Sequence, residues 1–283
     1  MNHIYHNMNR AELDAAYNNT KADKDFSATL SRFQTQSAAF YKTAVCKKNL
    51  AYGAGPRQRF DWFPAAGLGT APTFIFIHGG YWQNCTKEDY SFIARGPLAH
   101  GFNVVLAEYT LAPEATMTEI VAEIGMLLDH LVADPDQLGI TGGPICLSGH
   151  SAGGHLTAMY RSHPSISFAM PISALTDLEP ISLCWLNDKL QLTEREIIEL
   201  SPLHNIQGGA PMTIAFGADE LPELIRQSKE YARACIDAGE NVTICPLPDC
   251  NHFVILDDLS NPDGLLMRSL VHSFSEYVGY THF

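Results

Sequence analysis

The sequence predicts an α/β fold in which a mostly parallel sheet is covered by helices on both faces. Three observations support this prediction: short apolar runs alternate with amphipathic helical patterns, hydrophobic residues make up 46% of the chain, and no internal repeat is visible. At 283 residues the chain is long enough for one large α/β domain or two small ones.

Short apolar runs, often β-branched or aromatic, predict the strands of this sheet. In chain order they are Phe74–Ile77, Asn103–Glu108, Pro144–Leu147, Ile166–Pro171, Met212–Phe216 and Val242–Leu247. Because strands that alternate with helices are joined by crossover connections, we expect them to pair mainly in parallel.

Helical patterns lie between several of these runs. In Thr116–Ala133 the apolar residues fall on one face of a helix: Ile120, Val121, Ile124, Leu127, Leu128, Leu131 and Val132. Further helices are expected at Ala152–Met159, at Leu221–Ala238, which Gly239 ends, and at Pro262–Val278.

Two segments do not fit the alternation. Residues 1–55 are polar and helix-prone, at Arg10–Tyr17 and Ser27–Tyr41, and residues 174–205 insert a helical excursion after a strand. Both are expected either to cap the carboxyl edge of the sheet, where α/β proteins bind ligands, or to pack as ordinary surface elements. The predicted organisation is therefore a helical segment, 1–55, that contributes to the cap, and an α/β domain, 56–283, that carries the cap insertion at about 174–205.

Composition limits the classes of protein. The formal net charge is −13, from 18 basic and 31 acidic residues, and no Lys/Arg run occurs, so a nucleic-acid partner is not expected. The sequence shows no signal-peptide pattern and no run of about 18 apolar residues, which predicts a soluble, cytoplasmic protein without a membrane partner.

The seven cysteines are odd in number and scattered, which predicts buried or free thiols in a reducing compartment. They are Cys46, Cys85, Cys146, Cys184, Cys235, Cys245 and Cys250. Cys245 and Cys250 lack a second pair at zinc-finger spacing, and His3 and His6 stand alone near the start of the sequence, so no metal or other cofactor is expected.

The strongest functional motif is Gly149-His150-Ser151-Ala152-Gly153, a G-x-S-x-G sequence between a predicted strand and a predicted helix. This context is that of a nucleophile elbow, which exposes a serine hydroxyl on a sharp, strained turn. Side chains at Gly149 and Gly153 would collide with the neighbouring strand and helix. Ser151 is therefore the candidate nucleophile, and the N–H of Ala152 is expected to point at an oxygen that becomes negative.

A serine needs a base, and in this fold class the chain order is serine, acid, histidine. The histidines after Ser151 are His155, His163, His204, His252, His272 and His282. His252 is the candidate base, because it alone follows a late strand within a loop, where the base must lie. The acid should follow the preceding strand, and there Asp219 and Glu220 are adjacent; either could accept the imidazole N–H, and the other could cap the next helix.

The sequence His78-Gly79-Gly80-Tyr81 follows the first predicted strand. Acyl transfer places negative charge on the carbonyl oxygen, which fixed N–H donors must meet, and in esterases a loop of the HGGG type supplies them. The glycines let the N–H groups of Gly79, Gly80 or Tyr81 approach closely. Together with Ala152 they are the predicted oxyanion hole, and His78 is expected to be a structural hydrogen-bonding residue.

The motifs HGGYWQ, AEYTLAPE, GHSAGGH and NHF together resemble those of α/β-hydrolases of the arylformamidase (kynurenine formamidase) type, relatives of the hormone-sensitive-lipase-like carboxylesterases. The resemblance runs from Ala16-Tyr17-Asn18-Asn19 to His252-Phe253, and HGGYWQ is more specific than HGG alone. Thr110 stands where the esterase pattern Y-R-L-A-P-E has arginine.

This resemblance implies an α/β-hydrolase fold with a small helical cap and a choice between the two acids. Pro222-Glu223-Leu224 and Arg226-Gln227-Ser228 match the family pattern, which places the acid at Glu220; many relatives carry Asp there, so Asp219 stays as the alternative. Trp185 and Leu186, with Tyr81 and Trp82, are expected to form a wall for the acyl or aryl group of the substrate. The resemblance also implies a homodimer.

The function predicted is that of a metal-free serine hydrolase, which cleaves a carboxylic ester, an aryl formamide or a small amide through an acyl-enzyme. The alternatives are a general carboxylesterase without formamidase activity and a catalytically silent hydrolase fold used for binding. A metal-dependent hydrolase has no supporting motif, since H-E-x-x-H and any tight His/Asp cluster are missing from the sequence.

Overall fold

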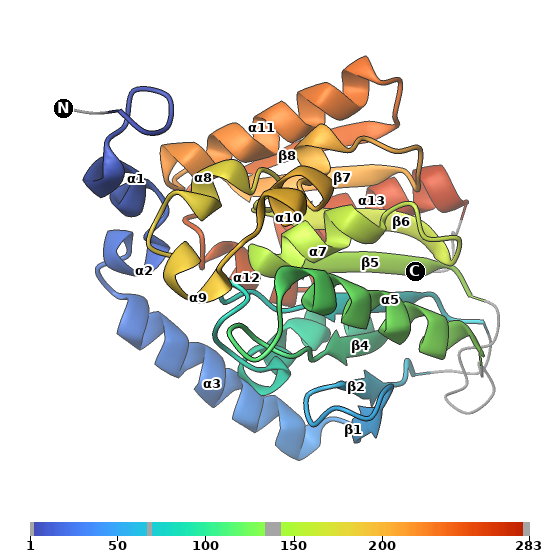
Figure 1. Ribbon diagram of the computed structural model, residues 1–283. Coiled ribbons are helices and arrows are strands. Elements are labelled where there is room, and N and C mark those ends of the chain that lie inside the picture. Colours follow the sequence, from blue (N-terminus) through green and yellow to red (C-terminus); the bar gives the residue numbers. More distant parts are fainter. Residues whose placement is uncertain (1–2, 67–69, 134–142, 280–283) are drawn as a thin grey trace.

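The computed structural model describes residues 3–66, 70–133 and 143–279. Its centre is an eight-stranded sheet with the order β1-β2-β4-β3-β5-β6-β7-β8 (Figure 1). The strands are β1 Lys47–Ala51, β2 Arg59–Phe63, β3 Thr73–Ile77, β4 Asn103–Ala107, β5 Ile145–His150, β6 Ile166–Ile172, β7 Met212–Gly217 and β8 Val242–Leu247. Strands β3 to β8 pair in parallel, whereas β1–β2 and β2–β4 are antiparallel pairs.

The predicted fold class is confirmed, and each predicted run is a strand. The largest difference in bounds is in β5, which continues to His150 instead of ending at Leu147. This extension brings the strand directly to Ser151, so no flexible linker separates the sheet from the predicted elbow.

The sequence did not predict β1 and β2. Most side chains of β1 are exposed, and β2 carries Asp61 in its middle, which breaks the apolar pattern. Asp61 is fully buried and lies 3.1 Å from Nζ of Lys87, so an ion pair compensates the charge inside the protein. The expectation of helix for residues 1–55 is therefore wrong at 47–51, where the chain forms an antiparallel edge strand.

Helices cover both faces of the sheet (Figure 1). They are α1 Arg10–Ala16, α2 Asn19–Ala22, α3 Phe26–Thr43, α4 Arg95–Ala99, α5 Met117–Ala133, α7 Ala152–Tyr160, α8 Glu179–Ser182, α9 Asn187–Leu190, α10 Glu194–Glu199, α11 Pro222–Asp237, α12 Ile255–Ser260 and α13 Leu265–Val278, with 3₁₀ helices η1 Lys87–Ala94 and η2 Pro202–His204. Four of them correspond to the helices predicted between and after the strands: α5, α7, α11 and α13.

Two apolar clusters lie on opposite faces, because successive strand residues point in opposite directions. In β3, Ile75 and Ile77 pack in the cluster that contains α5 and Leu156 of α7. Phe74 and Phe76 pack in the cluster that contains α12, α13 and Phe33 of α3. On α5 the predicted apolar face is buried except at Val132, which is 42% exposed near the helix end.

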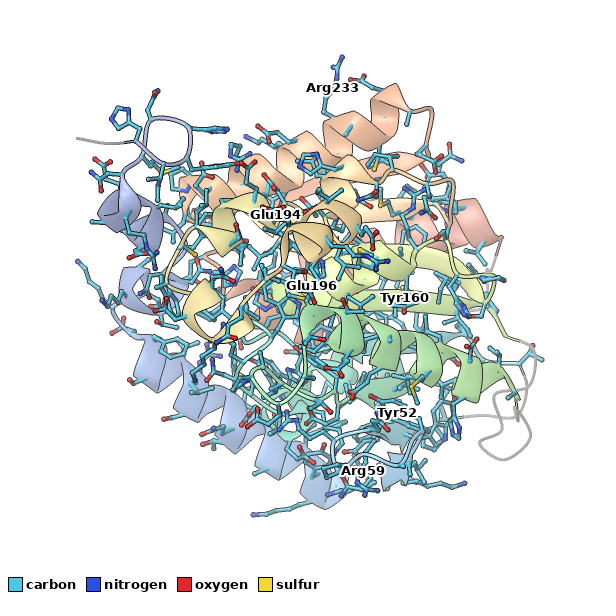
Figure 2. All side chains as sticks on the ribbon, viewed as in Figure 1. Tyr52, Arg59, Tyr160, Glu194, Glu196 and Arg233 are labelled. Carbon is cyan, nitrogen blue, oxygen red and sulfur yellow. The ribbon has the colours of Figure 1, made fainter. Side chains whose placement is uncertain are left out.

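The two segments outside the alternation are helical, as expected, apart from β1. Residues 1–55 contain α1, α2 and α3, and residues 174–205 contain α8, α9, α10 and η2. The two segments touch, since the backbone N–H of Trp185 donates to Oδ1 of Asp14 at 2.7 Å, and Figure 1 shows α1–α3 and α8–α9 on the same side of the molecule. Helix α10 is tied to the start of α5 by Glu196, labelled in Figure 2, whose Oε1 accepts from the N–H of Thr118 at 3.0 Å.

Among the described residues, no helix combines the length and the apolar character that crossing a membrane requires. All seven cysteines are free thiols.

Candidate active site

Ser151 occupies a strained turn between β5 and α7. Its φ is 56° and its ψ is −114°, a backbone conformation that costs about 1–3 kcal/mol for a residue with a Cβ. Two backbone hydrogen bonds hold it there: its N–H donates to the carbonyl of Ile172 at 2.8 Å, and its carbonyl accepts from the N–H of His155 at 3.0 Å. The turn thus has the geometry of a nucleophile elbow.

The glycines on either side of Ser151 allow close backbone packing. A Cβ on Gly153 would lie 2.0 Å from the carbonyl oxygen of Ile77 in β3, and a Cβ on Gly149 would lie 2.3 Å from the carbonyl oxygen of Gly153. Any side chain at either position would push α7 away from the sheet. The steric reason predicted for these glycines is the one that the structure has.

His252 lies beside this turn and contacts one of the two candidate acids. Its Nδ1 is 3.0 Å from Oε2 of Glu220, and both side chains are buried. The other oxygen of Glu220 accepts from Ser173 Oγ at 2.5 Å and from the N–H of Gly217 at 2.6 Å. Asp219 is exposed and makes no such contact, so the structure brings Glu220, and not Asp219, to the histidine.

The carboxylate fixes the tautomer of His252. Since a carboxylate only accepts, the proton of the imidazole belongs on Nδ1, which leaves Nε2 with a free lone pair. An imidazole in this state can take a proton from a hydroxyl.

His150 ties the loop of His252 to the elbow. Its Nε2 donates to the backbone carbonyl of His252 at 2.8 Å, and the two rings are 4.5 Å apart. Burial, and secondarily the neighbouring His252, lower the pKa of His150 well below its usual value of 6.5, so the ring stays neutral. His150 lies within the G-x-S-x-G motif, but its position there gives no sign of this contact.

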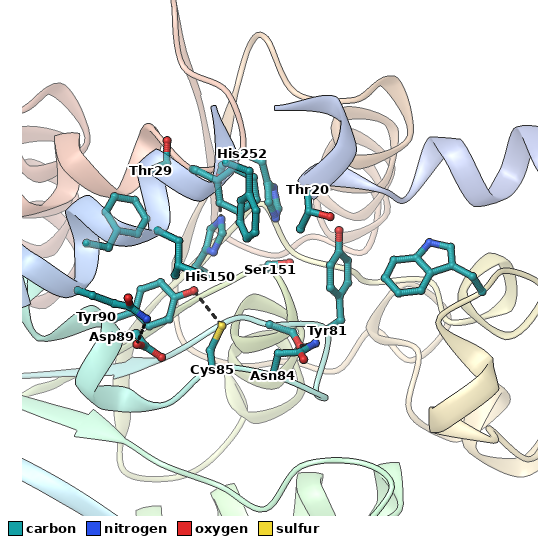
Figure 3. A pocket seen from close by; sticks show the side chains of 17 residues that line it. Thr20, Thr29, Tyr81, Asn84, Cys85, Asp89, Tyr90, His150, Ser151 and His252 are labelled. Carbon is teal, nitrogen blue, oxygen red and sulfur yellow. Dashed lines mark hydrogen bonds between the residues drawn. The ribbon is translucent and has the colours of Figure 1, made fainter. Parts of the chain in front are cut away.

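A cavity of about 440 Å³ opens in front of Ser151 and His252 (Figure 3). Within the described part of the chain the hydroxyl of Ser151 has no hydrogen-bonding partner. Hydrogen bonds between a nucleophile and its base often tighten only when substrate is bound. The aromatic residues of the wall come from several elements: Phe26, Phe33, Tyr81, Tyr90, Trp185 and Phe253.

The glycine loop, residues 78–83, lies beside the elbow and lines the cavity with Gly80 and Tyr81. Gly80, Tyr81 and Trp82 all have positive φ, at 114°, 57° and 58°. Two consecutive aromatic residues in this conformation are strained, because the left-handed region brings Cβ close to the next carbonyl. Gly79 packs directly against the elbow, since a Cβ there would lie 3.2 Å from Cβ of Ser151.

Hydrogen bonds to the carbonyls of this loop set the direction of its N–H groups. His78 Nδ1 is 2.7 Å from the carbonyl oxygen of Gly79, and the N–H groups of Gln83 and Asn84 both reach the carbonyl of Gly80 at 2.9 Å. In a trans peptide the N–H points opposite to the C=O. The N–H groups of Gly80 and Tyr81 therefore point away from these bonds.

The same argument applies to the elbow, where the carbonyl of Ser151 points into α7 and the N–H of Ala152 points out of the helix start. Among the described residues, no acceptor bonds the N–H groups of Gly79, Gly80, Tyr81 or Ala152. Unpaired donors beside a serine can stabilise an oxygen that gains negative charge.

A buried carboxylate supports the glycine loop from behind. Glu108 Oε1 lies 3.0 Å from Nε2 of His78 and 2.6 Å from Nη2 of Arg57. Both ring nitrogens of His78 thus lie within hydrogen-bonding distance of oxygen acceptors. Burial opposes the charge on Glu108, but His78 and then Arg57 lower its pKa below 4.5. The sequence signal for Glu108 was present, since it begins the EYTLAPE motif.

The predicted aromatic wall is only partly present. Tyr81 and Trp185 line the cavity, with their rings 5.5 Å apart in an edge contact. Trp82 differs from the expectation: it is fully buried, packs at 5.1 Å on the ring of His155, and does not line the cavity. Leu186 is also buried and does not line the cavity. Its carbonyl accepts a hydrogen bond from Nε2 of Gln83 in the glycine loop at 2.8 Å.

The remaining histidines considered as bases lie elsewhere. His155 is buried and bonds through Nε2 to the carbonyl of Leu200, while His163, His204 and His272 do not line the cavity; His282 lies outside the described residues. In the part of the chain that the structure describes, no group of three His, Cys, Asp or Glu side chains is arranged to hold a metal ion.

The chain is similar to known proteins over most of its length. A kynurenine formamidase of Salmo salar is 30% identical over 240 residues, which are 79% of this chain and 80% of the relative. A kynurenine formamidase of Danio rerio is 27% identical over 285 residues, which are 93% of this chain and 96% of the relative. The family model BD-FAE matches residues 62–165.

Among solved structures, a proposed thioesterase of a Silicibacter species superposes with a TM-score of 0.83. It is 29% identical and covers 92% of this chain and 99% of its own.

Proposed function

The chain belongs to the kynurenine formamidase family and has the α/β-hydrolase fold, and we propose that it is a serine hydrolase that cleaves an aryl formamide or a carboxylic ester through an acyl-enzyme. Ser151 is the nucleophile, His252 the base and Glu220 the acid in this proposal. The observation that carries it is the contact of 3.0 Å between His252 and Glu220 beside the strained Ser151.

The reaction proceeds in two steps. Ser151 Oγ attacks the carbonyl carbon while Nε2 of His252 takes the hydroxyl proton, and the carbonyl oxygen becomes negative. The N–H groups of Gly79, Gly80, Tyr81 and Ala152 supply the oxyanion hole. When the tetrahedral intermediate collapses, the bond to the amine or alcohol breaks and His252 gives that leaving group its proton. Water then attacks the acyl-enzyme by the same route and releases the acid.

Relatives named as kynurenine formamidases support an aryl formamide as the substrate, and the alternative is a general carboxylesterase. The two differ in what fills the cavity of about 440 Å³. A formyl group needs almost no room, so a formamide would place its aryl leaving group against the aromatic wall that contains Tyr81 and Trp185. An ester would place a longer acyl chain there.

The cap is part of the proposal. Residues 1–55 and 174–205 are expected to cover the site, a role supported by the presence of Phe26 and Trp185 in the cavity wall. We also expect a cytoplasmic location, which the seven free thiols support. A homodimer is a prediction from the family resemblance, and sedimentation would measure it.

A substrate panel tests the function. Wild type is assayed with N-formylkynurenine and with p-nitrophenyl esters of rising chain length, beside Ser151→Ala and with a fluorophosphonate label. We expect labelling of wild type but not of Ser151→Ala, and turnover that is fastest for formyl or very short acyl groups. Turnover of long acyl esters alone would replace the formamidase by a general carboxylesterase. A wild-type protein without label or turnover would leave a silent binding fold.

A further inference from the structure

The strained turn of the glycine loop needs support from outside, because the residues within it do not favour its conformation. Tyr81 and Trp82 are held at φ of 57° and 58°. Such strain persists only where surrounding contacts over-determine the backbone, and it is concentrated at functional sites. The question is which contacts hold the turn, and whether they also aim its N–H groups.

The hydroxyl of Tyr81 makes the most direct tie. It donates to the backbone carbonyl of Tyr17 at 3.0 Å and accepts from the backbone N–H of Asn19 at 3.0 Å. These two residues form the junction between α1 and α2 and are far from the loop in sequence. The side chain is 7% exposed, so water does not compete for these bonds.

The junction is itself anchored to the α/β domain. The hydroxyl of Tyr17 donates to Glu223 Oε2 at 3.1 Å and accepts from Gln227 Nε2 at 2.8 Å, both on α11. Farther along the segment, the hydroxyl of Tyr5 donates to Asp177 Oδ2 at 2.9 Å. The backbone that receives the hydroxyl of Tyr81 is therefore part of a buried hydrogen-bond network and does not depend on the loop.

We propose that Tyr81 is a positioning residue whose hydroxyl, bound to the α1–α2 junction, holds the N–H groups of Gly80 and Tyr81 toward the oxyanion. The segment before β1 is then a working part of the oxyanion hole and more than a cover over the cavity. This inference rests on the proposed function. It assigns the hydroxyl a role separate from the backbone N–H of the same residue and from the ring in the cavity wall.

The central experiment compares Tyr81→Phe with Tyr160→Phe. Both changes remove one phenol hydroxyl that donates to a backbone carbonyl. Tyr160, labelled in Figure 2, does not line the cavity, and its hydroxyl donates to the carbonyl of Val121 at a distance of 2.8 Å. We expect kcat of Tyr81→Phe to fall about 10- to 100-fold with KM within about twofold of wild type, since a misaimed donor weakens only the transition state. Tyr160→Phe should keep the wild-type kcat.

A transition-state mimic separates aim from stability. An aryl trifluoromethyl ketone forms a tetrahedral anionic adduct with a serine, so its Ki should rise in Tyr81→Phe by the factor by which kcat/KM falls. If the change at Tyr81 only destabilises the fold, the melting temperature of Tyr81→Phe should fall about as much as that of Tyr160→Phe, and its Ki should stay unchanged.

A second pair of variants approaches the same bond from the other side. Asn19 is the first residue of α2, a position where proline fits because its N–H has no intrahelical acceptor. Asn19→Pro removes the N–H that donates to Tyr81, whereas Asn19→Ala keeps it. We expect kcat of Asn19→Pro to be about three- to tenfold below that of Asn19→Ala, since one of the two bonds to the hydroxyl is lost.

The outcomes separate the two proposals. If wild type takes the fluorophosphonate label and turns over substrate, but Tyr81→Phe matches Tyr160→Phe in kcat and Ki, the positioning role is overturned and the serine hydrolase stands. If wild type neither labels nor turns over substrate, the proposed function itself fails. A selective loss of kcat in both Tyr81→Phe and Asn19→Pro supports the inference.

Discussion

Two loops face the cavity, and they are held in place in different ways. The elbow is fixed mainly by backbone contacts: Gly153 lies against Ile77 of β3, and the peptide groups of Ser151 bond to Ile172 of β6 and His155 of α7. The glycine loop, residues 78–83, is fixed by side-chain hydrogen bonds to distant segments. The elbow therefore needs only glycines at fixed places in one short motif, whereas the geometry of the loop depends on particular side chains that reach other segments.

The ties of the loop come from separate elements. Tyr81 reaches the α1–α2 junction, Trp82 packs on His155 in α7, and Gln83 bonds to the carbonyl of Leu186. A substitution on the elbow side should thus affect either the chemistry or the whole fold. A substitution on the loop side should lower kcat by a smaller factor.

The largest effect is expected at the acid that contacts His252. Glu220→Gln keeps an oxygen that can accept from Ser173 and Gly217, but its amide cannot hold the imidazole proton on Nδ1 in the same way. We expect kcat to fall about 10⁴-fold with the melting temperature nearly unchanged. Steady-state kinetics measure this.

Asp219→Asn is the matched control, since Asp219 is adjacent and exposed. It should stay within about twofold of wild type. A large loss in Asp219→Asn with little loss in Glu220→Gln would move the acid to Asp219 and show that His252 turns toward solvent during the reaction.

The second effect tests the backbone packing of the elbow. In Gly153→Ala the new Cβ would lie 2.0 Å from the carbonyl oxygen of Ile77, so α7 must move away from β3. We expect the free energy of unfolding to fall by about 3 kcal/mol. Gly208→Ala makes the same change where the nearest atom would be 3.7 Å away, and urea denaturation should show little difference from wild type.

The sequence indicates the elbow side because the contacts there are made by backbone atoms and require only the glycines of one motif. Ser151, Gly149 and Gly153 form one short motif, and the strand before it and the helix after it have clear patterns. The late strand and loop were enough to indicate His252. Sequence alone left Asp219 and Glu220 equivalent from their residue types, because only the path of the chain after β7 decides which side chain turns inward.

The sequence failed where side chains are paired over long distances. Strand β2 was not predicted, because Asp61 breaks its apolar pattern. The charge of Asp61 is acceptable inside the protein only because Lys87 lies beside it. Trp82 was expected in the cavity wall, but a tryptophan in a left-handed turn points away from it and onto His155. Phe33 forms part of the wall because α3 runs beside the cavity, a placement that its own helical pattern does not contain.

The third effect tests the support of the loop from behind. Glu108→Gln weakens the bonds from His78 and Arg57, so the carbonyl of Gly79 and the N–H of Gly80 lose part of their alignment. We expect kcat to fall about tenfold, less than the loss of a whole oxyanion donor. Kinetics are measured at a temperature at which the variant is fully folded.

Glu123→Gln is the control for this change, because Glu123 is equally buried and accepts from the backbone N–H of Thr110 at 2.7 Å without touching the loop. It should lose stability but keep kcat. Equal losses of kcat in the two variants would mean that the rate follows general stability and that Glu108 has no particular link to the loop.

The smallest effect is a pH dependence of stability on the loop side. Burial raises the pKa of Glu108, but His78 and then Arg57 lower it more, so that the pKa lies below 4.5 overall. A carboxyl group whose pKa is lower in the folded state stabilises the fold above its unfolded-state pKa, and this contribution is lost as the pH falls through the folded-state value. The gap in unfolding free energy between wild type and Glu108→Gln should therefore be full at pH 7 and shrink below about pH 4.5.

The gap between wild type and Gly153→Ala, which involves no titrating group, should stay constant over the same range. Urea denaturation at a series of pH values measures both gaps, and a constant gap for Glu108→Gln would mean that the carboxylate does not carry the charge that holds the loop.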